Sequence, residues 1–244
     1  IKNSKTFQTR VFRAVSQILI QNHNFTELER FTIATYKRFV DEKWFDKNNH
    51  ESKLQMLIYI VNALFKNQKY TESLDYAETL GEEMSAFNNQ FYNKYLFFYY
   101  NALVINYAHI DLGRGIKALD EMEKEIKGLK NPYYEFFILW NKATLLFSQR
   151  KYNEAIRNLV RLFLNDHYKK ADVSLKLKIG VAECIMQYES GDTETALKRV
   201  EQVRKNYAMQ LAAGDYKREL AVLKLLQRMV EAGELEKDKK LMVE

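Results

Sequence analysis

The stretch RKYNEAIRNLVRLF, residues 150–163, decides the fold of this chain. It opens with an aromatic residue, Tyr152, and a small residue, Ala155, follows three positions later. Apolar residues such as Ile156 and Leu159 then recur at helical spacing. Two antiparallel helices approach closely only where one of them presents little side chain. The stretch therefore predicts the second helix of a tightly packed helix pair.

The same pattern returns on both sides of this stretch, which indicates an internal repeat. It is found in NQKYTESLDYAETL (67–80), HIDLGRGIKALDEM (109–122) and ESGDTETALKRVEQV (189–203). The anchor position is held by Tyr70, Leu112, Tyr152 and Thr193, and the small position by Ser73, Gly115, Ala155 and Ala196. These small residues are 42, 40 and 41 positions apart. A weaker copy, NHNFTELERF (22–31), places Phe25 at the anchor and Leu28 at the packing position.

Composition favours helices throughout. The 244 residues include one proline and eight glycines, while 14% are aromatic, so the chain has few helix breakers and many bulky side chains to bury. We expect an all-α solenoid of antiparallel helix pairs with about 11 to 12 helices, forming one domain over residues 1–244. The expected repeats are approximately 4–45, 50–87, 89–128, 132–166 and 170–208, and a capping helix is expected at 214–231.

The runs RKYNEAIRNLVRLF (150–163) and SGDTETALKRVEQV (190–203) resemble the second helix of the tetratricopeptide repeat (TPR). The resemblance covers roughly residues 20–208, and the repeats of 40 to 45 residues make it a divergent, TPR-like one, since the family's repeat has 34. It implies a right-handed superhelix whose first helices line a concave surface. It also implies that this surface binds an extended peptide or a helix of a partner protein.

Two sets of residues on the expected first helices are candidates for partner binding. Asparagines recur before the anchors, and a side-chain amide can pair with the backbone of a bound peptide, although these amides could equally be satisfied locally or by water. Aromatic residues exceed what one helix stripe can bury, so some are expected at the surface. The candidates are Asn62, Asn101 and Asn141, together with Tyr99, Tyr100 and Trp140.

Charge supports a second hypothesis, binding of nucleic acid. The chain has a net charge of +6, and residues 142–178 alone contain nine Lys and Arg against three acids. Residues 71–90 contain five acids and no base. A basic segment can attract phosphates, or it can be a solvated helix face. A third hypothesis is a regulatory TPR domain within a larger signalling protein.

Enzymatic chemistry is not indicated. No glycine-rich phosphate loop is present, and His23, His50, His109 and His167 lack metal-ligand spacing and are expected in turns or at the surface. We therefore expect no cofactor, no metal and no catalytic residue. Cys184 has no second cysteine to pair with, which favours the cytoplasm, although a removed leader could have preceded Ile1. No membrane span is expected, and neither the partner's identity nor the oligomeric state follows from the sequence.

Overall fold

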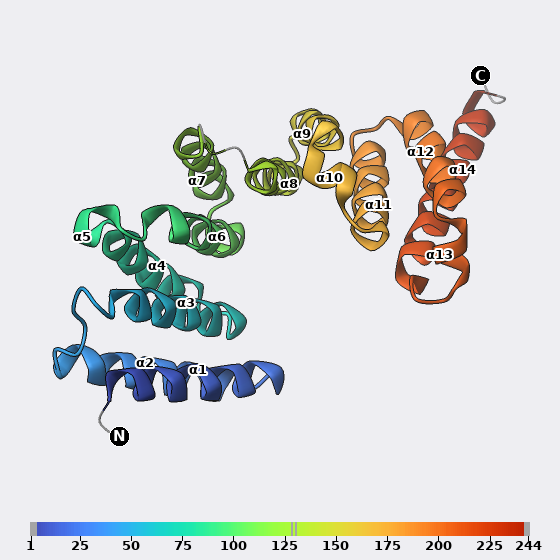
Figure 1. Ribbon diagram of the computed structural model, residues 1–244. Coiled ribbons are helices and arrows are strands. Elements are labelled where there is room, and N and C mark those ends of the chain that lie inside the picture. The colour runs from blue at the N-terminus through green and yellow to red at the C-terminus, as the bar shows by residue number, and fades with distance from the viewer. Residues whose placement is uncertain (1–3, 128, 130, 242–244) are drawn as a thin grey trace. The chain divides into compact units, whose positions relative to one another are not determined.

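The computed structural model describes residues 4–127, 129 and 131–241, and these residues form helices joined by short loops (Figure 1). The chain divides into two compact units, Ile1–Glu125 and Ile126–Glu244, which we call unit 1 and unit 2. The expectation of a single domain over residues 1–244 stays a prediction.

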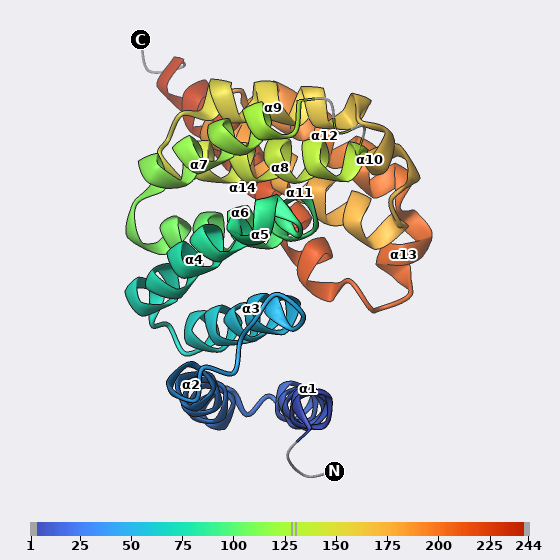
Figure 2. The ribbon, with the colours of Figure 1, turned by 60° about the vertical axis from the view of Figure 1, so that its left-hand side comes forward.

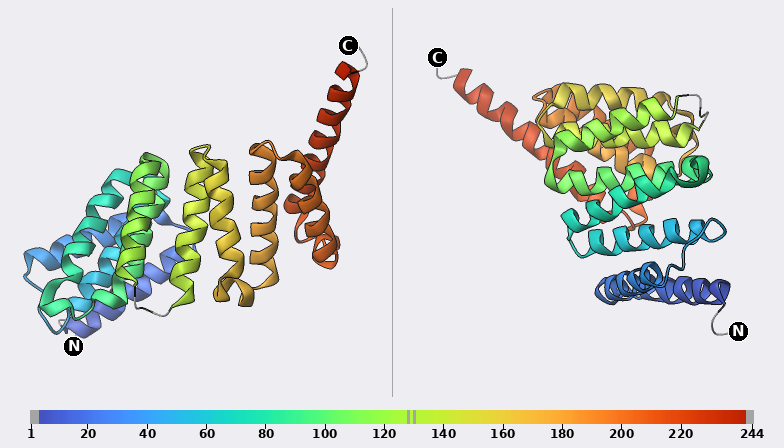
Figure 3. Two further views of the ribbon diagram at one scale, coloured as in Figure 1. Left: turned by 90° about the horizontal axis from the view of Figure 1, so that it is seen from above. Right: turned by 90° about the vertical axis from the view of Figure 1, so that its left-hand side faces the viewer.

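Unit 1 contains three helix pairs and one short helix. The pairs are α1 (Lys5–Gln21) with α2 (Phe25–Asp41), α3 (His50–Lys66) with α4 (Tyr70–Met84), and α6 (Tyr92–Ile110) with α7 (Leu112–Glu125); α5 (Ala86–Asn89) connects the second and third pairs. Helix α2 packs on α3, and α4 packs on α6, so the pairs are layered in sequence order (Figures 2 and 3). The first helices α3 and α6 also contact each other directly.

Unit 2 repeats this arrangement. Its pairs are α8 (Pro132–Ser148) with α9 (Tyr152–Leu164) and α11 (Val173–Glu189) with α12 (Thr193–Asn206), and its further helices are α10 (Asp166–Lys170), α13 (Ala208–Ala212) and α14 (Lys217–Leu241). Helix α9 packs on α11, and α14 packs on both α11 and α12 (Figure 3, left). Leu223 and Leu226 of α14 join the core around Cys184, so α14 covers the end of this unit.

The repeat pattern is confirmed at its two marked positions. All five second helices begin at the anchor residues Phe25, Tyr70, Leu112, Tyr152 and Thr193. The packing residues three positions later, Leu28, Ser73, Gly115, Ala155 and Ala196, are all buried. The described residues contain fourteen helices where 11 to 12 were expected. The difference arises from the short connecting helices α5, α10 and α13, which the apolar periodicity of the repeats does not encode.

Four of the five helix pairs turn through the same three-residue loop. In the loop after α1, the Asn24 N–H donates to the carbonyl of Leu19 and the His23 N–H donates to that of Ile20, which is the Schellman arrangement. The middle residue has a positive φ in every case: 53° at His23, 62° at Gln68, 60° at Arg150 and 86° at Gly191. Helix α11 thus ends before Gly191, and Asp192 caps the next helix by accepting from the Thr195 N–H at 3.0 Å.

Candidate functional site

The best candidate site in unit 1 is the surface that α3 and α6 form together, which we call the first-helix face. A hollow of about 280 Å³ lies between the two helices. Helix α3 contributes Gln55, Ile58 and Tyr59, and α6 contributes Lys94, Tyr95 and Phe98. The lining is mostly hydrocarbon and aromatic ring, and the Phe98 side chain is 44% exposed. Such a hollow suits an apolar side chain of a partner.

A network of polar groups holds one edge of this hollow in place. Glu51 accepts hydrogen bonds from Lys94 Nζ at 2.6 Å, from Gln55 Nε2 at 3.1 Å and from the Tyr95 hydroxyl at 3.3 Å. The hydrogen bond from Lys94 lowers the pKa of Glu51, although partial burial acts in the opposite direction. Burial raises the pKa of Tyr95 to about 12, so its hydroxyl remains a donor at neutral pH. The edge is therefore rigid and locally charge-balanced.

Two of the predicted asparagines flank the hollow. Asn62 lies one helical turn beyond Ile58 on α3 and is exposed, and Asn101 lies one turn beyond Phe98 on α6 and is partly exposed. Neither side-chain amide has a hydrogen-bond partner among the described residues. Both amides are therefore available to pair with the backbone of a bound segment.

The other predicted asparagine and the tryptophan lie in unit 2. Asn141 Nδ2 donates to the carbonyl of Phe137 in its own helix at 2.8 Å. This amide therefore follows the alternative stated above, a hydrogen bond formed locally. Trp140 is partly exposed on α8. Both residues belong to unit 2, whereas the first-helix face belongs to unit 1.

The expectation for Tyr100 needs correction, whereas Tyr99 is partly exposed. The predicted exposure of Tyr100 is wrong, since its side chain is only 6% exposed and burial raises its pKa. Tyr99 packs on α4, where a Cβ added to Gly81 would lie 2.7 Å from its ring. The physical reason is that α6 is covered by α3 on one side and by α4 and α7 on others. Consecutive aromatic residues on such a helix point to different neighbours.

Sequence reasoning missed the residues that form the hollow itself. Phe98 belongs to the same run of aromatic residues as Tyr99 and Tyr100, and it differs from them only in the side of α6 on which its side chain lies. A usable signal was the helical spacing from the asparagines, because residues three or four positions before Asn62 and Asn101 share their faces. That count leads to Ile58, Tyr59, Phe97 and Phe98, and all of these except Phe97 line the hollow.

Part of the basic segment gathers at one place in unit 2. Arg150, Lys151 and Arg157 line a hollow of about 390 Å³ at the turn between α8 and α9, together with Tyr152, Asn153, Glu154 and Ser190. Other cations of the segment are engaged locally. Lys169 pairs with Asp166 at 3.2 Å, and Lys176 Nζ donates to the Lys169 carbonyl at 2.7 Å.

Within the described part of the chain, no three His, Cys, Asp or Glu side chains are grouped as metal ligands. A membrane-crossing helix, long and apolar enough for that role, is likewise not found among those residues. The expectation that all four histidines lie in turns or at the surface is wrong for His50, which is buried with Nε2 at 2.8 Å from the Glu83 carbonyl. Cys184 is buried, and burial raises the pKa of its thiol to about 12.

Comparison with solved structures identifies the fold as a TPR-like helical repeat. A protein of the kinesin-light-chain kind from Podosopora anserina, with nearly identical TPR-like repeats, matches with a TM-score of 0.66 at 15% identity, over 85% of this chain and 97% of that chain. A single-residue variant of it matches with a TM-score of 0.67 at 15% identity, over 84% and 97%.

A second kind of structure also matches. Bacillus thuringiensis PlcR, solved in complex with the peptide PapR7 and DNA, has a TM-score of 0.55 at 14% identity, over 86% of this chain and 74% of that chain. No family model and no curated protein sequence matches the chain. The expected all-α, TPR-like architecture is therefore confirmed, and at these identities the similarity is one of fold.

Proposed function

We propose that this protein is a non-enzymatic interaction scaffold whose first-helix face in unit 1 binds an extended peptide or a helix of a partner protein. The observation that carries the proposal is the aromatic hollow between α3 and α6, flanked by two amides without partners. A partially exposed phenylalanine beside free amides offers both apolar contact and backbone recognition. The PlcR structure supports the proposal, because that TPR-like protein was solved with a bound peptide.

The residues have distinct roles in this proposal. Phe98, together with Ile58 and Tyr59, receives an apolar side chain, and aromatic anchors of this kind contribute much of the free energy of binding at an interface. Asn62 and Asn101 hold the backbone of the ligand, since an amide both donates and accepts. Tyr100 is buried and takes no part. Partner binding by Tyr99, Trp140 and Asn141 stays a prediction.

The test is a binding screen with the intact chain. Short peptides of random sequence are immobilised and probed with the labelled protein, and the peptides that bind are then titrated in solution. Phe98→Ala should weaken that binding by about tenfold or more, because truncating an aromatic anchor removes about 2 kcal/mol of binding free energy. Asn101→Ala should weaken it by a smaller factor, about fivefold, as expected for one hydrogen bond.

A matched control separates this site from general loss of surface aromatics. Phe87 is 42% exposed, close to the value for Phe98, but it lies on α5, packs on His50 and does not line the hollow. Phe87→Ala should leave the affinity for the selected peptides unchanged. If Phe98→Ala and Phe87→Ala behave alike, or if no peptide binds, the proposal is wrong.

Binding of nucleic acid through residues 142–178 is the second candidate, and one observation favours it. Arg150, Lys151 and Arg157 converge on one hollow in unit 2, which concentrates positive charge where a phosphate could lie. Its test is the affinity for a generic oligonucleotide at two salt concentrations. Phosphate contacts release counterions, so binding should weaken steeply with salt and with Arg157→Ala; an affinity that is insensitive to both would exclude this candidate.

A regulatory role inside a larger signalling protein would use the same peptide-binding face. It differs from a simple scaffold because peptide binding would change the activity of another domain. The cytoplasm is the compartment that we propose, on the basis of a single, buried, unpaired cysteine.

A further inference from the structure

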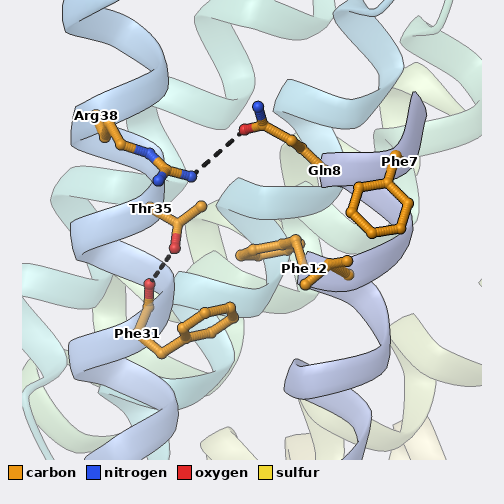
Figure 4. A pocket seen from close by; sticks show the side chains of 7 residues that line it. Phe7, Gln8, Phe12, Phe31, Thr35 and Arg38 are labelled. Carbon is orange, nitrogen blue, oxygen red and sulfur yellow. Dashed lines mark hydrogen bonds between the residues drawn. The ribbon is translucent and has the colours of Figure 1, made fainter. Parts of the chain in front are cut away.

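A second apolar surface lies on the first helix pair, away from the first-helix face. A hollow of about 260 Å³ separates α1 from α2, and the side chains that line it are Phe7, Gln8, Val11, Phe12, Phe31, Thr35 and Arg38 (Figure 4). Phe12 is buried at its floor and stacks on Phe31 with ring centroids 5.7 Å apart. Val11 and Ile18 of α1 are 42% and 56% exposed. We call this surface the α1–α2 groove.

The next pair of unit 1 shows how such a groove is normally filled. The loops after α1 and α3 have the same geometry and are 45 positions apart, so residues 45 positions apart are equivalent. The equivalents of Val11, Ile18 and Thr35 are Met56, Ala63 and Leu80, which are at most 1% exposed. Helix α2 lies over this pair, because it packs on α3 and its Tyr36 ring lies beside the Tyr76 ring of α4. In unit 1, the groove between α3 and α4 is therefore occupied by a helix, α2, of the preceding pair.

Unit 2 independently shows the same relation. The positive-φ residues His23 and Gly191 are 168 positions apart, so the equivalents of Val11, Ile18 and Thr35 there are Ile179, Met186 and Val203. All three are at most 3% exposed. Helix α9 packs on α11, while Val203 belongs to the core that α11 and α12 form with α14. The groove of a pair is thus filled by an amphipathic helix in both units.

The two covering helices place an aromatic ring at the same point. In unit 1, Tyr36 of α2 lies 6.2 Å from the Tyr76 ring of α4. In unit 2, Phe163 of α9 lies 5.6 Å from the Arg199 guanidinium of α12. Tyr76 and Arg199 are both equivalents of Phe31. A helix that fills the α1–α2 groove would therefore place an aromatic ring beside Phe31.

Charge indicates what the rest of that helix must contain. Helix α1 includes three cations and no acid. Lys5 pairs with Asp46 at 2.6 Å, and Arg13 lies near Tyr95 of the first-helix face, whereas Arg10 has no charged partner among the described residues. Arg38 lies at the rim, where Nη2 donates to Gln8 Oε1 at 3.5 Å. Carboxylates on a helix bound in the α1–α2 groove would complement these cations. The α1–α2 surface of a second copy of this chain would carry the same positive charges and would be repelled.

We propose that the α1–α2 groove binds an amphipathic helix of another protein, one with an aromatic residue on its apolar face and carboxylates along its edges. The helix would occupy the place that α2 occupies on α3–α4. This groove shares no lining residue with the first-helix hollow, although Phe12 contacts the Tyr59 ring of that hollow, so a single chain could hold two partners at once.

The test uses a peptide whose sequence derives from α2, the helix that fills the equivalent groove. A labelled peptide of residues 25–41, with Arg30, Lys37 and Arg38 replaced by glutamate, is titrated against the intact chain by fluorescence anisotropy. We expect saturable binding. A basic counterpart, with Glu27, Glu29 and Asp41 replaced by lysine, should bind about tenfold more weakly, because it opposes the cations of α1.

Variants of the chain locate the binding site. Val11→Glu should weaken binding of the acidic peptide by about tenfold or more, since it places a negative charge in the apolar groove, where it also repels the carboxylates of the peptide. Ile18→Glu provides a second test with a more exposed residue, should the first variant lose helicity. Val160→Glu is the matched control, because Val160 is 55% exposed on α9 in unit 2, and it should bind like the unaltered chain.

Three outcomes would overturn the proposal. The first is no saturable binding of the acidic peptide, and the second is binding that Val11→Glu and Ile18→Glu leave unchanged. The third is self-association in sedimentation that Val11→Glu abolishes, which would assign the groove to a second copy of this chain. Peptides selected on the first-helix face should still bind Val11→Glu, so failure here is distinguishable from failure of the proposed function.

Discussion

At the scale of single residues, small side chains set how closely the helices of a pair approach. Ser73 is fully buried, and its hydroxyl donates to the Val61 carbonyl at 3.0 Å, while Asn106 Nδ2 donates to the same hydroxyl at 2.9 Å. The side chain thus satisfies polar groups of α3 and α6 at a point where a larger residue would separate the helices. Ala155 and Ala196 fill the same position with a methyl group.

The first prediction concerns this packing position. Ala155→Leu should lower the free energy of unfolding by about 1 to 3 kcal/mol, because the added atoms have no space beside α8. Urea unfolding followed by circular dichroism measures the change. Val160→Leu on the exposed side of the same helix is the control and should change stability by less than about 0.5 kcal/mol. Equal effects at the two positions would show that Ala155 does not lie at a close helix contact.

The second prediction concerns Gly81 and Tyr99. Gly81→Ala should raise helix propensity by about 1 kcal/mol, but its Cβ would meet the Tyr99 ring at 2.7 Å. The two effects oppose each other in the unaltered chain. In a Tyr99→Ala background the steric conflict is gone, so Gly81→Ala should stabilise the protein by about 1 kcal/mol. A double-mutant cycle from urea unfolding that shows no coupling would contradict this packing.

At the scale of elements, one loop geometry recurs and four different residue types adopt it. Histidine, glutamine and arginine stand at the positive-φ position in three loops, and glycine stands there in the fourth. A residue with a Cβ is strained in the left-handed region, whereas glycine is not. The loops therefore differ in strain, although in all four the N–H of the positive-φ residue donates to the carbonyl three positions earlier.

The third prediction follows from this difference. Gln68→Gly should stabilise the protein by up to about 1 kcal/mol, and Gly191→Ala should destabilise it by about the same amount. Thermal and urea unfolding of both variants measure the two signs. Gln149→Gly, at the helix end next to Arg150, has a negative φ and should not stabilise. If Gln68→Gly and Gly191→Ala changed the free energy of unfolding in the same direction, these loops would not require a left-handed backbone conformation at the two positions.

At the scale of the whole molecule, ionised groups shape how stability depends on pH. The Lys94 hydrogen bond lowers the pKa of Glu51, and the Lys5 hydrogen bond lowers the pKa of Asp46. A carboxyl whose pKa is lowered in the folded state stabilises that state at pH values above its pKa in the unfolded chain. This stabilisation is lost as the pH falls through the pKa of the carboxyl in the folded state. Glu183 behaves oppositely, because burial raises its pKa despite the Arg199 partner.

The fourth prediction is therefore a loss of stability in acid. The urea midpoint should fall as pH decreases from about 5 to about 3, since the unfolded pKa values of these carboxyls lie near 4. Lys94→Met should make the decline shallower, because Glu51 then titrates closer to its unfolded value. An unchanged pH profile in this variant would show that the Glu51 to Lys94 contact does not contribute in solution.

The sequence alone determined the repeat, because close helix packing requires a small residue at one fixed place and an anchor at another, and both recur along the chain. The starts of the second helices and the buried packing positions could be predicted in this way. Asn62 and Asn101 could be singled out because asparagines recur before the anchors, and their role in partner binding stays a prediction. Tertiary structure alone decided which aromatic residues are exposed. Phe98, Tyr99 and Tyr100 are adjacent in sequence, yet they point to different surroundings because successive residues on a helix are about 100° apart. Which direction is open depends on where α3, α4 and α7 pack, and that is a property of several helices together.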